Sequence, residues 1–310
     1  MSRSNPVSRG TSCGFTLFGT SCLIFFLLCI LCVVPTAEAQ DTLPLRSPFD
    51  EEVKRAVDAL SEMSGSPDSL KYSGLSRLVG GIAPHHDLAL DMIVRFYAEL
   101  SANFTRRDLR RVWLLAPDHY RRARRFVAVC PSVWELSDGL LTPDASALDA
   151  LRNLEIVETT SELFAEEHGI SIHIPLIARF FPGANVVPIV LRRDIPDIAL
   201  LSLRARMLEM IGDGDLVILS MDLSHYKPPE EMAAEDRNTL SVLTEMRPQA
   251  TGRIDADARR AAALALLLFK DMGATRGELI ERTDSSTLLG RRVESGTSYA
   301  TIIYRRIEDL

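Results

Sequence analysis

Runs of apolar residues alternate with amphipathic stretches along most of the chain. The apolar runs have the continuity of strands buried on both faces, and they cover residues 78–83, 111–116, 127–130, 185–191, 215–220 and 297–304. Stretches with apolar residues at helical spacing cover residues 51–63, 88–100, 195–211 and 255–272. Buried strands interleaved with helices are typical of α/β proteins. We therefore predict an α/β fold in which helices flank a central sheet that is largely parallel or mixed.

The first 39 residues differ from the rest of the chain. Arg3 and Arg9 precede an apolar run over residues 15–34, and Ala37-Glu38-Ala39 then gives the small-residue pattern of a signal-peptide cleavage site. A run of about 20 apolar residues is also long enough to span a bilayer. Residues 1–39 are therefore predicted to be a signal peptide or a membrane anchor. Either function would place the body outside the cytoplasm, secreted, periplasmic or attached to the membrane.

The rest of the chain is predicted to contain a short connecting part and one large domain. Residues 40–77 are interpreted as a linker followed by a helix, and residues 78–310 as a single domain without a visible internal boundary. Only one of the five cysteines, Cys130, lies after the first 39 residues, so the body has no internal disulfide. The formal net charge of −7 creates no overall positive field, so we expect no nucleic-acid partner.

Histidines cluster at the predicted ends of strands. The six histidines of the chain are His85, His86, His119, His168, His173 and His225. The first two follow strand 78–83, the third follows strand 111–116, and the last follows strand 215–220. Ligands of open α/β sheets bind outside the carboxyl ends of the strands, so these side chains predict a common site. Imidazole binds iron, zinc and copper, and two histidines with one carboxylate suit non-haem Fe(II) or catalytic zinc.

Some of these histidines also have a purely structural interpretation. Neighbouring residues of an extended segment face opposite sides, so only one of His85 and His86 can face a shared ligand. His168 and His173 are five positions apart and therefore point about 140° apart on a helix. At least one of these two is expected to pack or to cap rather than to bind a ligand.

The candidate carboxylates have structural alternatives as well. Asp222 fits a turn position, and Asp257 stands near the predicted start of helix 255–272, where a carboxylate stabilises the helix dipole without any role in catalysis. Residues 121–125 are rich in arginine and follow His119 directly. They fit a solvated surface or a patch for a substrate phosphate or carboxylate. Cys130 is interpreted as a buried apolar residue rather than a nucleophile.

Five motifs occur in the order that a known family has them. They are Ala83-Pro84-His85, Ala116-Pro117-Asp118-His119, Glu167-His168-Gly169-Ile170-Ser171-Ile172-His173-Ile174-Pro175, Ser220-Met221-Asp222-Leu223-Ser224-His225 and Ser298-Tyr299-Ala300. With these motifs, residues 78–304 resemble the Memo family, also called AmmeMemoRadiSam system protein B. The resemblance implies a fold related to that of the class III extradiol dioxygenases.

The resemblance also implies a metal site. Two ligands would be His85 and His119, and the third family ligand is a Cys, at whose position this chain has Asp257. Two histidines and one carboxylate form a hard donor set that suits Fe(II) or Mn(II), with Zn and Cu as alternatives. His225 matches the acid/base histidine of the dioxygenases, and Asp222 would orient it. The residues expected to contact the substrate or to support the ligands are His86, Glu167, His168 and His173.

These observations lead to one main functional hypothesis and two alternatives. The main hypothesis is an exported, non-haem metal oxidoreductase of the extradiol-dioxygenase type that acts on a small molecule. The alternatives are a metal-dependent hydrolase and a non-catalytic metal-binding or protein-interaction module on the same fold. Family analogy alone suggests AMMECR-type or radical SAM partners, whose cytoplasmic chemistry conflicts with the predicted export.

Overall fold

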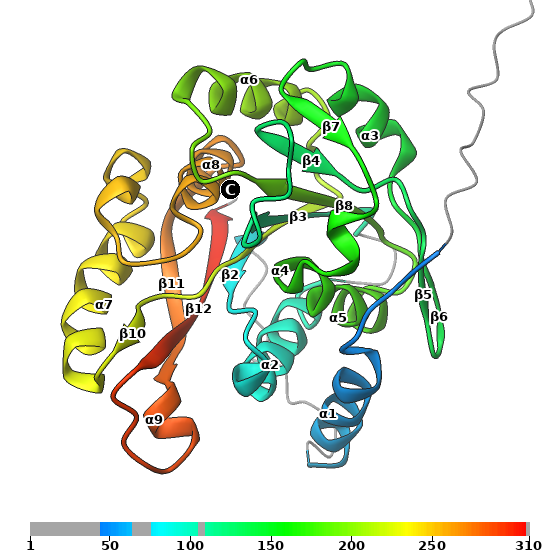
Figure 1. Ribbon diagram of the computed structural model, residues 1–310. Helices are drawn as coiled ribbons and strands as arrows, with labels where there is room; N and C mark the ends of the chain where they lie inside the picture. The colour runs from blue at the N-terminus through cyan, green and yellow to red at the C-terminus, as the bar shows by residue number, and fades with distance from the viewer. Residues whose placement is uncertain (1–43, 64–75, 105–108, 308–310) are drawn as a thin grey trace, which may run out of the picture. The chain divides into compact units, whose positions relative to one another are not determined.

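The central element of the protein is a mixed β-sheet with helices on both faces, as the computed structural model in Figure 1 shows. The structure describes residues 44–63, 76–104 and 109–307. Within them, the nine-stranded sheet has the order β10-β12-β2-β9-β3-β8-β4-β7, and β11 pairs with β12. The strands are β2 (Ser76–Ala83), β3 (Arg111–Pro117), β4 (Val127–Val129), β7 (Val157–Thr159), β8 (Asn185–Leu191), β9 (Asp215–Ser220), β10 (His225–Lys227), β11 (Ala274–Asp284) and β12 (Gly296–Ile307). The predicted α/β fold with a mixed central sheet is confirmed.

The middle of the sheet is parallel and fully covered. β2, β9, β3 and β8 pair in parallel, whereas β12 and β4 join this group antiparallel on its two sides. Every residue of β3 and of β9 is buried. A strand that is buried on both faces needs apolar residues at nearly every position, which explains the continuous apolar runs in the sequence.

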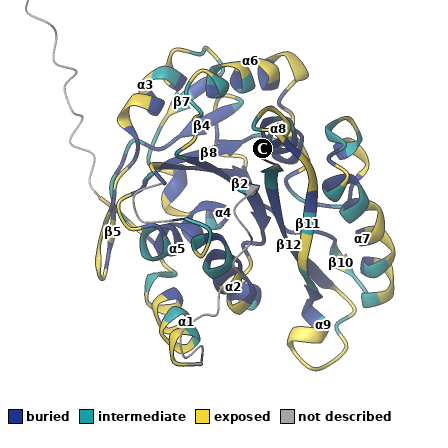
Figure 2. Ribbon diagram, turned by 180° about the vertical axis from the view of Figure 1, so that it is seen from behind, coloured by how far each residue is buried: buried dark blue, intermediate teal, exposed yellow. Residues whose placement is uncertain are grey.

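Side chains of the parallel strands alternate between two cores. Trp113 and Leu115 of β3 belong to the core on one face, and Val112 and Leu114 belong to the core on the other. Figure 2 shows the buried sheet between helices whose outer surfaces are exposed. The first face packs against α3 (Ala145–Arg152), α6 (Asp197–Leu208) and α8 (Arg259–Asp271), and the second against α1 (Asp50–Met63), α2 (Leu90–Ser101) and α5 (His173–Phe180).

The segment before the sheet is part of the folded body. β1 (Leu45–Arg46) pairs in parallel with β5 (Trp134–Leu136), and β6 (Gly139–Leu141) completes this small sheet. Val53 of α1 is fully buried in the core. The part predicted as a linker and a helix, residues 40–77, thus also contains a strand, β1, whose backbone pairs with a distant strand.

The prediction of a signal peptide or anchor at residues 1–39 lies outside the described residues. Among the helices that the structure describes, none has the length and apolar character needed to cross a membrane.

Several elements differ from the sequence prediction, and three of them bear on the site or on the sheet. The last long helix, α8, begins at Arg259 rather than at residue 255, so Asp257 precedes it and makes no capping hydrogen bond. Asp257 thus stands directly before the N-cap, Ala258, but does not cap the helix. The helix α7 (Pro229–Thr244) and the strand β11 were not predicted. Both have many exposed polar residues, because α7 lies at the surface and β11 pairs with only one neighbour.

Candidate metal centre

The parallel strands bring three candidate ligands to one edge of the sheet. His85 lies two residues after the end of β2, His119 two residues after β3, and Asp222 two residues after β9. Because β9 lies between β2 and β3, the three side chains come together at the carboxyl ends of neighbouring strands. Asp257 enters from the segment before α8 and completes the group.

Asp257 lies between the two histidines. Its Oδ2 atom is 3.0 Å from His85 Nε2 and 3.2 Å from His119 Nε2. The backbone fixes this carboxylate, because Asp222 N–H donates to Asp257 Oδ1 over 3.2 Å and Asp257 N–H donates to the Asp222 carbonyl over 3.4 Å. Asp222 Oδ2 is 3.8 Å from His85 Nε2, and its Oδ1 accepts the His85 backbone N–H.

The other ring nitrogen of each histidine is held by a polar side chain. His119 Nδ1 lies 2.6 Å from Glu167 Oε1, and its backbone N–H donates to Glu167 Oε2. His85 Nδ1 shares a hydrogen bond of 2.8 Å with Ser220 Oγ. Both rings therefore turn Nε2 toward Asp257. Carboxylate and other polar partners at the second nitrogen are the usual environment of metal-binding histidines, because they fix the tautomer and the ring orientation.

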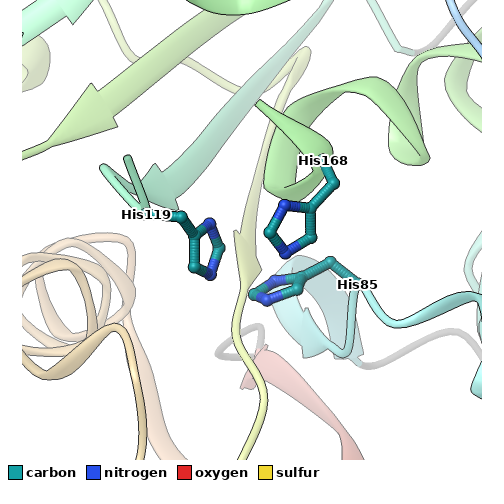
Figure 3. A group of neighbouring side chains, drawn as sticks. All are labelled: His85, His119 and His168. Atoms are coloured by element: carbon teal, nitrogen blue, oxygen red, sulfur yellow. The ribbon is translucent and has the colours of Figure 1, made fainter. Parts of the chain in front are cut away.

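A third imidazole belongs to the same group. His168 is the first residue of α4 (His168–Ser171), and its ring stacks on that of His119 with 4.1 Å between centroids. The centroid of His85 is 5.0 Å away. Figure 3 shows the three rings around a common space. The His85 side chain is 1% exposed, that of His119 19% and that of His168 33%, so the group opens to solvent on the side of His168.

The carboxylates of the group favour positive charge on the neighbouring imidazoles. Burial lowers the pKa of His119, but hydrogen bonds to Asp257 and Glu167 outweigh it and raise the pKa to about 10. Burial likewise lowers the pKa of His85, and the charges of Asp222 and Asp257 raise it further than burial lowers it. The pKa of Asp257 lies far below its usual range because the two imidazoles outweigh the effect of burial. A divalent cation would supply the positive charge that these contacts favour.

Asp222 and His168 have pKa shifts that disfavour their charged forms. Burial and the nearby Asp257 raise the pKa of Asp222. Burial and the charges of His85 and His119 lower the pKa of His168 to about 4. His168 is therefore neutral near pH 7, the form in which an imidazole can bind a metal.

The donors fit a metal ion. Within the described residues, two groups bring their ligand atoms within 4.8 Å of one another: one is His85, His119 and His168, and the other is His85, Asp222 and Asp257. Nitrogen and carboxylate donors together suit iron, manganese, zinc and copper. The chain therefore has a candidate metal-binding group of histidine and aspartate, and its donor types do not select one metal.

His225 lies beside this group on β10. Its Nδ1–H donates to the Leu223 carbonyl over 2.7 Å, which leaves Nε2 as the free nitrogen. Nε2 lies 3.9 Å from Asp222 Oδ2, and the side chain is 28% exposed. The structure thus places the predicted acid/base residue next to the carboxylate that was predicted to orient it.

His86 and His173 take other positions. His86 is exposed and caps the short 3₁₀ helix at Asp87–Ala89 by accepting the Leu88 N–H, so it belongs to neither donor group. His173 is fully buried, and its Nδ1 lies 3.0 Å from the Tyr97 hydroxyl. Burial lowers the pKa of His173 to about 3. These positions agree with two expectations, that only one of His85 and His86 faces a shared ligand and that at least one of His168 and His173 packs or caps.

Sequence analysis missed Asp236, a buried carboxylate beside the site. Its Oδ1 accepts hydrogen bonds from Ser224 Oγ at 3.0 Å and Ser298 Oγ at 2.9 Å, and its Oδ2 accepts from Arg282. Ser224 precedes His225, so this network fixes the start of β10. Both serines lie in motifs named above, but Asp236 lies in the unpredicted helix α7.

Comparisons with known proteins agree with the motifs. A family model described as Memo-like protein matches residues 51–303. This chain belongs to the Memo family. The resemblance predicted from the five motifs is therefore confirmed, and the family region begins within α1 rather than at residue 78.

Relatives of this Memo family member are distant in sequence. A MEMO1 family protein of Ignicoccus hospitalis is 24% identical over 189 residues, which cover 58% of this chain and 66% of that protein. A MEMO1 family protein of Pyrobaculum arsenaticum is 23% identical over 268 residues, which cover 83% of this chain and 94% of that protein. An uncharacterized Escherichia coli K12 protein of known structure has a TM-score of 0.44 and 11% identity, covering 73% of this chain and 99% of that one.

Proposed function

We propose that this Memo family protein is a metal-dependent oxidoreductase. Its metal is held by His85, His119 and Asp257, and Fe(II) is the metal that we propose ahead of Mn(II), Zn(II) and Cu(II). The observation that carries the proposal is the position of Asp257 Oδ2, 3.0 and 3.2 Å from the two Nε2 atoms. Two donors that each lie about 2.1 Å from one ion, at an angle of about 90–110°, are themselves about 3.0–3.4 Å apart. Asp257 Oδ2 is thus spaced from each of the two Nε2 atoms as two ligands of a single ion are spaced from one another.

The surrounding residues support proton transfer at such a centre. A bound metal supplies a Lewis acid with positions for substrate and, in the case of iron, redox chemistry with dioxygen. His225 presents Nε2 toward Asp222, and its tautomer is fixed by the Leu223 carbonyl. In this proposal His225 moves a proton to or from a small-molecule substrate, and Glu167 keeps His119 in its binding orientation.

Hydrolysis is the second candidate function. Imidazole and carboxylate donors also bind catalytic zinc, and the site opens to solvent at His168, which admits a water molecule. The metal that the protein contains when it is isolated from its native source decides between the two candidates, because relative affinity alone follows the same order of metals at most sites. Export is a further part of the proposal; it rests on residues 1–39, and fractionation of cells that express the full chain tests it.

Metal titration tests the proposed centre. We expect the metal-free protein to bind one equivalent of Fe(II), Mn(II), Zn(II) or Cu(II) under anaerobic conditions. His85→Ala and Asp257→Ala each remove a ligand and should weaken binding more than about 100-fold, beyond the loss typical of a supporting residue. Calorimetric titration measures the affinity.

The matched control for this experiment is His86→Ala. His86 is the exposed neighbour of His85 and lies outside both donor groups, so its loss should leave the affinity unchanged. Binding that is indifferent to His85→Ala and Asp257→Ala would refute the proposed centre, and so would the absence of binding by every one of the four metals.

A further inference from the structure

We propose that His168 Nε2 is a third imidazole ligand, so that three histidines and Asp257 hold the metal. This inference rests on the proposed function and adds a ligand to its site. The motif pattern does not make His168 a metal ligand. The sequence instead predicts that it contacts the substrate or supports the ligands.

The orientation of the stacked rings carries the inference. Glu167 Oε1 lies 2.6 Å from His119 Nδ1 and 3.8 Å from His168 Nδ1, so both rings turn Nδ1 toward the same carboxylate. The planes differ by only 28°, so the Nε2 atoms lie side by side on the far side of both rings. His119 Nε2 faces Asp257 there, and Figure 3 shows His168 directed toward the ring of His85.

The contacts of His168 also leave the correct nitrogen free. Its Nδ1 lies 3.3 Å from the Tyr120 hydroxyl, which can accept the Nδ1–H. Within the described residues, no hydrogen bond involves His168 Nε2. A neutral imidazole with hydrogen at Nδ1 has its lone pair on Nε2, and that lone pair is what a metal ion binds.

The position of His168 differs from that of a packing residue. His173, which packs in the core, is fully buried against Tyr97, whereas His168 stands at the open side of the ligand group. The donor atoms of His85, His119 and His168 meet the same distance criterion as those of the aspartate group. His168 therefore closes the side on which the other donors leave the centre open.

A third imidazole changes which metals the site prefers. Imidazole suits iron, zinc, copper and nickel, whereas carboxylate-rich sites suit magnesium, calcium and manganese. With His168 as a ligand, we expect Mn(II) to bind more weakly relative to Zn(II) than it does at a site of two histidines and one carboxylate. In His168→Ala, the preference for Zn(II) over Mn(II) should therefore be smaller than in the unaltered protein.

The decisive experiment counts imidazole ligands with Cu(II) as the probe. Pulsed electron paramagnetic resonance of the Cu(II)-loaded full-length protein should detect three coordinated imidazoles, and His168→Ala should reduce the number to two. His168→Gln should give the same reduction while it keeps a polar side chain of similar length at the start of α4. Circular dichroism establishes that each variant is folded, and His86→Ala should retain three imidazoles.

The other outcomes overturn the inference and remain distinguishable from failure of the proposed function. Two imidazoles in the unaltered protein, or an unchanged number in both His168 variants, would exclude His168 as a ligand. If His85→Ala still abolished binding in that case, the centre of His85, His119 and Asp257 would stand without it. An unaltered protein that bound none of the metals would overturn both.

Discussion

Glu167 links two of the imidazoles of the candidate centre. It is 1% exposed, and its carboxylate accepts the Nδ1–H and the backbone N–H of His119 as well as the Gly169 N–H. A carboxylate with this many donors is strongly held in place. At the scale of the residue, Glu167 therefore sets the direction in which His119 Nε2 points.

Replacing Glu167 should weaken metal binding without abolishing it. Glu167→Gln keeps the size of the side chain but replaces a charged acceptor with a neutral amide, so His119 loses its fixed tautomer. We expect affinity for Zn(II) to fall about 10- to 100-fold, the loss typical of partners that orient a metal-binding histidine. Glu162→Gln, a nearby carboxylate outside the site, is the control. Equal affinities of the two variants would contradict this role.

Two glycines of β2 determine how closely helices pack on the sheet. A Cβ atom at Gly80 would overlap the Phe269 ring of α8 and the Val217 carbonyl, and one at Gly81 would lie 2.6 Å from Phe96 of α2. β2 is thus held between helices on both faces of the sheet. Since β2 ends two residues before His85, this packing also positions the first ligand.

Gly80→Ala should therefore destabilise the fold. The added methyl group has no space between the strand and α8, and overpacking of this kind costs about 1–3 kcal/mol. The free energy of unfolding from chemical denaturation measures the effect. Gly252→Ala is the control, because a Cβ there meets no atom within 4 Å and should change stability by less than about 0.5 kcal/mol. Similar losses in both variants would argue against close packing at β2.

Elements differ in how well their sequence predicts them. β8 and β9 have the predicted bounds, because strands buried on both faces require unbroken apolar runs. β11 has one neighbouring strand and alternates polar and apolar positions irregularly, so its eleven residues give no clear pattern. The helix α7 has only a few buried positions among its sixteen residues. β11 is defined by its pairing with β12, and α7 by its packing on β11, β12 and the segment that follows α7, so local sequence does not define either element.

The candidate site was predictable in part because its histidines follow strands that the sequence predicts well. Histidines at the ends of buried strands could be assigned to one sheet edge, and the family motif pointed to Asp257. Local periodicity extended the last helix to residue 255, however, and gave no indication of the turn that places Asp257 between two imidazoles. Asp236 was not predictable, because its partners Ser298 and Arg282 lie 62 and 46 residues away.

At the scale of the whole molecule, the charged pairs of the centre should make stability depend on pH. The pKa of His85 and of His119 is raised in the folded protein, that of His119 to about 10. The protonated imidazoles therefore stabilise the folded state in full below the ordinary histidine pKa of 6.5. This contribution to the free energy of unfolding is lost as the pH rises toward the raised pKa values.

The melting temperature of the metal-free protein measures this dependence. In the presence of a chelator, we expect it to fall between about pH 6.5 and 10 more steeply than that of His119→Gln, which lacks the titrating imidazole. Saturation with Zn(II) should remove the difference in slope, because the metal then replaces the protons. Parallel pH profiles of the two metal-free proteins would contradict the expected linkage.

The polar groups of the centre that follow β2, β3 and β9 are far apart along the chain and meet only when these strands have paired. His85 and Asp222 are separated by 137 residues, and the pairing of β2 with β9 brings them together. We expect these non-local contacts to form after the folding transition state, so that a bound ion stabilises the native state more than the transition state. Metal binding should therefore slow unfolding and leave the folding rate nearly unchanged, which is kinetic stability conferred by the cofactor.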